Sequence, residues 1–198
     1  MRLSIIIPVL NSHEVLRRQL LHFERIGLPS DTELIIVDDG SDPPLEKCIP
    51  KDMGLHYEDN DEEDGFPGED GEDCYVLWGD GDDLNIRIIH TRDKRPWTWA
   101  LARNFGAKKA EGEYLLFFDL DHIVTRELLD FVHKGFEHKV QFIREIAVLD
   151  ENGVLTQDRN VLWAYGFPES KGLGIGPLPN NFAMRRDLFW ELGGYRED

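Results

Sequence analysis

The sequence has few cysteines and lacks a long apolar run. Its 198 residues include only two cysteines, Cys48 and Cys74. Two are too few for a disulfide scaffold, and their spacing matches no metal-ligand pattern. The longest apolar stretches, such as residues 114–118, are far shorter than the roughly 20 residues of a membrane-spanning helix. We therefore expect reduced thiols, no transmembrane segment and a cytoplasmic location.

One segment also lacks basic residues. Residues 58–83 contain thirteen Asp and Glu side chains and no Lys or Arg, and without those carboxylates the net charge of −17 would be only −4. We interpret the chain as a nearly balanced domain with an acidic insert at about 58–83, a surface loop with a short strand near 75–78. Because phosphate contacts need Lys and Arg, direct nucleic-acid binding is not expected.

Short apolar segments predict the strands of an α/β fold. Each is rich in β-branched or aromatic residues, as is typical of buried strands. They are residues 3–8, 33–37, 86–90 and 114–118. Strands that alternate with helices indicate a mostly parallel central sheet flanked by helices.

Helices are predicted between these strands from their end signals. Asn11, with Glu14 three residues later, resembles a capping box and begins a helix that Gly27 ends. Thr98 is expected to cap a second helix, and Thr125 a third.

After residue 141 the pattern changes. Both sides of the turn at 150–153 have β character, residues 171–179 are rich in Gly and Pro, and residues 186–192 are helical in pattern. We predict a single domain, residues 1–198, in which a β-rich half from 123 to 198 is built onto the first 122 residues.

Three predicted strands end in polar residues that would meet at one edge of the sheet. These strand ends are residues 8–11, 38–41 and 119–122. In open parallel sheets, ligands bind beyond the carboxyl ends of the strands. Asp119 and Asp121 offer carboxylate oxygens of the kind that Mg²⁺ and Mn²⁺ prefer, and His122 can add a ligand for Mn²⁺. A metal held there would neutralise a diphosphate and help it leave.

Two other residues are candidates for ligand binding at this edge. Either Asp38 or Asp39 can accept a hydrogen bond from a base or a ribose, although the same residues also form a tight turn. Arg103 lies on a mostly apolar helical stripe, so its charge needs a partner. That partner is either a carboxylate at a strand end or a ligand phosphate.

Five segments, in this order, resemble the family 2 glycosyltransferases of the GT-A fold. They are residues 5–11 (IIIPVLN), 37–41 (VDDGS), 102–106 (ARNFG), 110–121 (AEGEYLLFFDLD) and 192–195 (LGGY). The resemblance covers nearly the whole chain apart from the acidic insert. It implies a GT-A-type Rossmann-like sandwich with a nucleotide-sugar-binding half at 1–122 and a β-rich acceptor-side half at 123–198.

The resemblance also implies how a nucleotide-diphosphate sugar, most often a UDP-sugar, would bind. The backbone around Pro8 and Val9 would contact the base, with Asn11 close to the nucleotide. Asp39 would accept a hydrogen bond from uracil or its equivalent. Arg103 occupies the position at which the family places an arginine near the nucleotide.

Metal binding and catalysis are implied in the same way. Asp119 and Asp121 match the D-x-D motif that binds Mn²⁺ or Mg²⁺, with Asp121 as the more direct ligand and His122 as a third ligand. Most members invert the anomeric centre, with a carboxylate base that deprotonates an acceptor hydroxyl. Either Glu197 or Asp198 is that base, or the base is absent from this sequence, in which case we expect a chain truncated at its C-terminus.

Some alternatives stay open at this point. Trp97 and Trp99 are interpreted as core residues, with stacking on a base or sugar as the alternative. A catalytically inactive nucleotide-sugar-binding or assembly domain would show the same motifs. A nucleotidyltransferase is less favoured, because residues 8–11 supply no Gly-rich basic loop. The acceptor, whether a saccharide, a protein or another hydroxyl compound, is not determined by the sequence.

Overall fold

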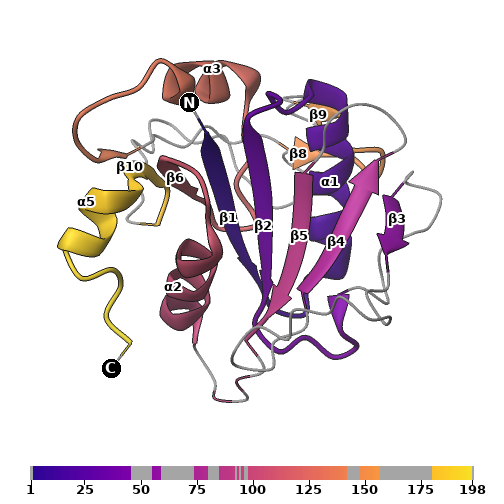
Figure 1. Cartoon of the computed structure of the whole chain (residues 1–198). Coiled ribbons are helices and arrows are strands. Elements are labelled where there is room, and N and C mark those ends of the chain that lie inside the picture. The colour runs from indigo at the N-terminus through magenta and orange to yellow at the C-terminus, as the bar shows by residue number, and fades with distance from the viewer. Residues whose placement is uncertain are drawn as a thin grey trace, which may run out of the picture.

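A computed structural model describes residues 2–45, 55–58, 74–79, 85–91, 93, 95, 98–141, 148–156 and 180–197. Its main element is an eight-stranded sheet with the strand order β3-β4-β5-β2-β1-β6-β10-β7 (Figure 1). The strands of this sheet are β1 (Leu3–Val9), β2 (Thr32–Asp38), β3 (Leu55–Glu58), β4 (Cys74–Gly79), β5 (Asn85–His90), β6 (Tyr114–Phe117), β7 (Val140–Gln141) and β10 (Phe182–Arg185).

The centre of the sheet is parallel and its flanks are antiparallel. Strands β5, β2, β1 and β6 run parallel to one another. On one side β4 and β3 add antiparallel pairs, and on the other side β10 pairs antiparallel with both β6 and β7. The predicted α/β architecture with a mostly parallel core is confirmed, and strands from both halves of the chain share the sheet.

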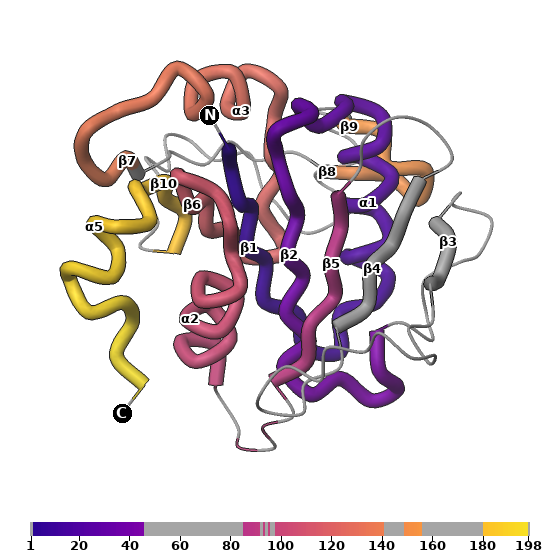
Figure 2. The backbone as a smooth tube through the Cα atoms, viewed as in Figure 1, coloured from indigo at the N-terminus to yellow at the C-terminus, as the bar shows by residue number. Residues whose placement is uncertain are grey.

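Helices cover both faces of the sheet. Helices α1 (His13–Ile26) and α3 (Arg126–His133) pack on one face, and α2 (Trp99–Lys109) and α5 (Arg186–Glu191) pack on the other (Figure 2). Side chains alternate between the faces of a strand. In β1, Ile5 and Ile7 therefore contact the layer of α1 while Ile6 contacts the layer of α2.

Helix α2 lies unusually close to the sheet. A Cβ atom on Gly106 would lie 2.6 Å from Cγ2 of Ile6 and 2.9 Å from Cγ2 of Val37. Only glycine fits at this contact, which accounts for the glycine in the ARNFG segment. The close packing fixes how far Arg103, one turn earlier, can reach beyond the sheet.

The predicted capping box at Asn11 is wrong. Helix α1 begins at His13, and Ser12 precedes it without a side-chain cap. Asn11 has a positive φ of 52° and bonds the turn after β2 instead: its N–H donates to Ser41 Oγ at 2.9 Å, and its Oδ1 accepts from the N–H of Asp42 at 2.7 Å. At Thr125 the prediction is confirmed, since its hydroxyl accepts from the N–H of Leu128.

Other predictions fall partly outside the structure's described ranges. The short strand expected at 75–78 lies within β4, whereas most of the acidic insert is not described. The turn at 150–153 joins β8 (Val148–Leu149) to β9 (Leu155–Thr156), a separate two-stranded sheet. The Gly/Pro-rich segment 171–179 lies outside the described residues. Among the helices that are described, none has the length and apolarity to span a bilayer.

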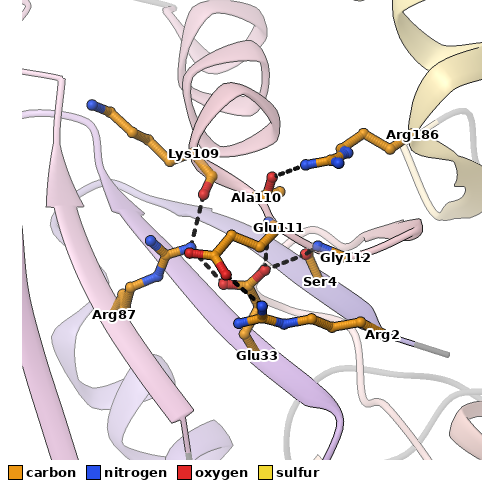
Figure 3. A network of polar contacts seen from close by, with 9 residues as sticks. All are labelled: Arg2, Ser4, Glu33, Arg87, Lys109, Ala110, Glu111, Gly112 and Arg186. Carbon is orange, nitrogen blue, oxygen red and sulfur yellow. Dashed lines mark hydrogen bonds and ion pairs between the residues drawn. The ribbon is translucent and has the colours of Figure 1, made fainter.

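A buried polar network joins the amino ends of the central strands (Figure 3). The Glu33 carboxylate accepts from Ser4 Oγ at 2.5 Å, from Arg87 Nη2 at 2.5 Å and from the N–H of Glu111 at 2.7 Å. Ser4 Oγ in turn accepts from the N–H of Gly112 at 2.8 Å. Burial would raise the pKa of Glu33, but these partners lower it. We call these five residues the amino-edge network; it ties the end of α2 to β1 and β2.

Candidate functional site

A cavity of about 580 Å³ opens at the carboxyl ends of β1, β2 and β6. The first turn of α2 and Asn180, which lies two residues before β10, complete its wall. The lining residues are Pro8, Val9, Leu10, Asp39, Thr98, Trp99, Arg103, Asp119, Leu120 and Asn180. The polar strand ends that the sequence singled out are therefore brought together as topology requires.

The adjacent residues Asp38 and Asp39 have different roles. Asp38 is buried, and its two carboxylate oxygens accept from the N–H groups of Ser41 at 2.8 Å and Leu45 at 3.1 Å. Burial opposes ionisation, but hydrogen bonds from His90, Ser41 and Leu45 outweigh it and lower the pKa of Asp38 to about 2. Asp38 therefore builds the turn after β2.

Asp39, in contrast, faces the cavity. Both of its carboxylate oxygens lie 2.7 Å from Oγ1 of Thr98, and Oδ1 also accepts from Oγ1 of Thr91 at 3.0 Å. Burial raises the pKa of Asp39, and the charges of Asp93 and Asp38 add to this rise. Thr98 occupies the N-cap position of α2 as expected, but its hydroxyl bonds Asp39 and makes no cap bond to the helix.

Arg103 has the carboxylate partner that the sequence predicted as one of two possibilities. Its guanidinium is buried, forms an ion pair with Asp119 through Nη2, and donates from Nη1 to the carbonyl of Trp99 at 3.1 Å. It also lies over the Trp99 ring, 5.0 Å from the ring centroid. The side chain thus joins the start of α2 to the end of β6.

Interpreting Trp99 as a core residue is wrong. The side chain is 44% exposed and lines the cavity, and Tyr195 meets the ring edge-on with centroids 6.2 Å apart. A large ring held between Arg103 and Tyr195 in an open cavity offers a flat surface to a ligand. Trp97 lies outside the described residues.

Asp119, Asp121 and His122 form a cluster that fits a divalent cation. One possible ligand atom from each lies within 4.8 Å of the others. His122 is 8% exposed, and neither ring nitrogen has a hydrogen-bond partner, although Nδ1 lies 3.0 Å from Oδ1 of Asp121. Two carboxylates and an imidazole that lacks hydrogen bonds match the ligand preferences of Mn²⁺, and the carboxylates also those of Mg²⁺.

Of the remaining predicted site residues that the structure describes, some line the cavity and others do not. Pro8 and Val9 line the cavity, whereas Asn11 is exposed and bonded to the turn after β2. Glu197 accepts from Asn104 Nδ2 at 2.6 Å and is not among the lining residues. Asp198 lies outside the described residues.

Sequence reasoning missed two asparagines that contact Asp119. Asn181 Oδ1 accepts from the N–H of Asp119 at 3.2 Å, and Asn180 Nδ2 lies 3.4 Å from its Oδ2. The antiparallel register of β10, which pairs Phe182 with Phe117, brings them there. The pair of asparagines directly before an apolar strand is the signal that could have pointed to them.

A family model described as glycosyl transferase family 2 matches residues 76–193, more than half of the chain. The chain belongs to glycosyl transferase family 2. The matched range includes Arg103 and the cluster around Asp121, and leaves out the strand ends at Pro8 and Asp39. No significant match was found among curated protein sequences.

Solved structures with this fold extend the likeness to the whole chain. S. aureus TarS 1–349 superposes with a TM-score of 0.56 at 17% identity, covering 98% of this chain and 50% of that one. The mannosyltransferase PcManGT from Pyrobaculum calidifontis, in complex with GDP-Man and Mn²⁺, gives 0.60 at 17% identity and covers 100% and 48%. TarS 1–349 in complex with UDP gives 0.55 at 18%, covering 98% and 50%. The GT-A-type fold is confirmed, and the chain spans about half the length of these solved structures.

Proposed function

We propose that this chain acts as a metal-dependent, inverting glycosyltransferase that transfers a sugar from a nucleotide-diphosphate donor to a hydroxyl acceptor. The observation that carries the proposal is one cavity lined by both Asp39 and Asp119. A hydrogen-bond acceptor for a base lies on one of these strand ends, and the metal-ligand cluster lies on the other. A nucleotide diphosphate has the same two chemical ends.

The chemistry of Asp39 favours a UDP-sugar or a GDP-sugar over a CDP-sugar. An ionised carboxylate only accepts hydrogen bonds. Uracil and guanine present ring N–H donors, whereas the corresponding ring nitrogen of cytosine is an acceptor and only its exocyclic NH₂ group can donate. Among the similar structures, one is a complex with UDP and another a complex with GDP-Man and Mn²⁺. We favour UDP, in line with the family resemblance.

Asp119, Asp121 and His122 are the residues that would hold Mn²⁺ or Mg²⁺. When bound, such an ion neutralises charge that develops on a diphosphate leaving group. Arg103 is positioned to orient Asp119 through their ion pair, and its guanidinium adds positive charge to the cavity wall. The exposed ring of Trp99 would cover one side of the bound donor.

Inversion requires a base on the acceptor side of the donor. Glu197 is engaged by Asn104 and does not line the cavity. We therefore propose that the carboxylate that deprotonates the acceptor hydroxyl comes from outside the described residues, with Asp198 among the candidates.

Calorimetric titration tests the donor site. UDP, GDP and CDP are titrated with and without Mn²⁺ into wild type, Asp39→Ala and Asp121→Ala. We expect Mn²⁺-dependent binding of UDP that Asp121→Ala abolishes and Asp39→Ala weakens about ten-fold or more, as for the loss of a charged hydrogen bond. A folded protein that binds none of the three nucleotides would contradict the proposal.

Asp121 is a cleaner position for this test than Asp119. The Asp121 side chain is 71% exposed, so its removal leaves the fold intact. Removal of Asp119 leaves the buried guanidinium of Arg103 without its ion pair, so stability and binding would fall together.

A domain that binds the donor without turnover is the second candidate. It is favoured by one observation, the position of Glu197 away from the cavity lining. This candidate predicts nucleotide binding with no hydrolysis of UDP-sugars and no transfer. Release of UDP from a panel of UDP-sugars, measured alongside the titrations, separates it from the enzyme.

A further inference from the structure

Two polar side chains on the inner face of α1 stand out from their surroundings. Gln19 and His22 are 2% and 3% exposed, whereas the neighbouring inward residues Leu16, Leu20 and Phe23 are apolar. A polar group at such a position lowers stability unless it finds hydrogen-bond partners. Both side chains find them in the backbone of residues 120–124, the loop that follows β6.

Gln19 bridges the backbone on the two sides of Asp121. Its Nε2 donates to the carbonyl of Leu120 at 3.0 Å and to the carbonyl of His122 at 2.6 Å. Because both partners are carbonyl oxygens, only the NH₂ end of the amide can face them. The N–H of His122 also bonds the carbonyl of Asp119 at 3.0 Å, which closes residues 119–122 into a turn.

His22 continues this support further along the loop. Its Nε2 lies 2.7 Å from the carbonyl of Val124. The Gln19 Oε1 and His22 Nδ1 atoms, in contrast, are buried without a hydrogen-bond partner. Each side chain therefore uses only the end that holds the loop, and burial of the other end lowers stability.

We propose that Gln19 is a positioning residue for the metal ligands, an inference that rests on the proposed metal site. Its amide fixes the two carbonyls that frame Asp121 and thereby the peptide planes that set the direction of that side chain. Without the bridge, the carboxylate of Asp121 would lose its fixed position within 4.8 Å of the ligand atoms of Asp119 and His122. Groups that orient metal ligands in this way commonly contribute ten-fold or more to metal affinity.

The test uses Mn²⁺ alone, with free Mn²⁺ followed by electron paramagnetic resonance. The acidic insert can also attract Mn²⁺, so binding at the site is defined as the part that Asp121→Ala removes. Gln19→Met keeps the length of the side chain and removes the donor. Ser4→Ala is the matched control, because it removes a buried hydrogen-bonding group at the opposite edge of the sheet.

We expect Gln19→Met to weaken Asp121-dependent Mn²⁺ binding about ten-fold, whereas Ser4→Ala leaves it unchanged despite a comparable loss of thermal stability. Folded Gln19→Met with wild-type affinity would overturn the positioning role and leave the metal site standing. Wild type that binds no more Mn²⁺ than Asp121→Ala would overturn both.

A second measurement on the unmodified sequence covers the case in which Gln19→Met does not fold. In ¹⁵N-labelled protein, the side-chain NH₂ resonances of Gln19 should shift on titration with Mg²⁺, and should not shift in Asp121→Ala. The backbone resonances of residues 120–124 report whether Mg²⁺ binds at Asp121. The inference would be overturned if these resonances shifted in wild type and not in Asp121→Ala, while the Gln19 resonances stayed unchanged.

Discussion

Two polar networks lie at opposite ends of the same parallel strands, and they differ in how well their groups are satisfied. At the amino ends, all atoms of the Glu33 carboxylate and the Ser4 hydroxyl are engaged by protein partners (Figure 3). At the carboxyl ends, buried His122 makes no hydrogen bond through either ring nitrogen, and Nε of Arg103 also lacks a partner.

We interpret this difference as a division between groups that stabilise the fold and groups of the proposed ligand site. Buried polar groups in native proteins nearly always find partners, so the buried groups without partners on Arg103, which lines the cavity, and on His122, which does not, suggest a partner that is not protein. This division has two exceptions. At the amino edge, Nε of Arg87 has no hydrogen-bond partner. At the carboxyl edge, the Arg103–Asp119 ion pair also supports the fold. The following variants test the contrast, from the largest expected change in stability to the smallest.

Glu33→Ala should have the largest effect on stability. It removes the acceptor of three hydrogen bonds and leaves Arg87, whose side chain is only 18% exposed, without its counter-charge. We expect the free energy of unfolding in urea to fall by about 3 kcal/mol. The fraction that remains folded should bind UDP and Mn²⁺ with wild-type affinity, and a large loss of that affinity would show that the amino edge is not purely structural.

Asp38→Asn should rank second. The two N–H groups of Ser41 and Leu45 each need an acceptor, and an amide offers only one oxygen. With a pKa of about 2 in the folded state and 3.8 as the ordinary value, ionised Asp38 stabilises the fold by about 2 kcal/mol above pH 4. This contribution is lost as the pH falls from 3.8 toward 2. Acid unfolding curves of the two proteins should therefore converge at low pH, and curves that stay parallel would speak against this account.

Much of this division could be predicted from the sequence, because it follows from strand order. Asp38 and Asp119 each follow an apolar run that predicts a strand. Because the strands were predicted to be parallel, both residues were expected at the same edge of the sheet. Local hydrogen-bond partners were not predictable in the same way. Asn11 and Thr98 carry ordinary helix-cap signals, yet their side chains bond groups in the turn after β2, 31 and 59 residues away in sequence.

Contacts made by long-range pairing were missed altogether. Asn180 and Asn181 reach Asp119 only because β10 enters the sheet antiparallel to β6. Gln19 interrupts an apolar helix face, and its partners are backbone carbonyls of a loop about 100 residues later. Side-chain patterns do not encode such backbone partners.

His122→Phe should change stability less, and in the opposite direction. It replaces a buried ring, neither of whose nitrogens makes a hydrogen bond, with a larger apolar ring, and it removes the contact of Nδ1 with Oδ1 of Asp121 at 3.0 Å. In the presence of EDTA we expect the free energy of unfolding to rise by up to about 1 kcal/mol, because a buried polar group without a partner lowers stability. Residues kept for binding often lower the stability of a fold in this way. Mn²⁺ should raise the melting temperature of wild type and not that of the variant. A variant that is destabilised in EDTA would mean that His122 holds the fold.

Asp39→Asn should have the smallest effect on stability and is the closest comparison with Asp38→Asn. Because the pKa of Asp39 is raised in the folded protein, ionisation of this group opposes folding, and the opposition grows as the pH rises through that pKa. The neutral amide should therefore leave the free energy of unfolding at pH 7 within about 0.5 kcal/mol of wild type, on the favourable side. In the proposed donor site, however, the carboxylate of Asp39 is the acceptor for the base. Calorimetry should show UDP affinity of wild type falling already at a pH above the ordinary aspartate value of 3.8, and should show no such pH dependence for Asp39→Asn. If both neighbours lost equal stability and neither changed UDP affinity, the assignment of Asp38 to the fold and Asp39 to the ligand would be wrong.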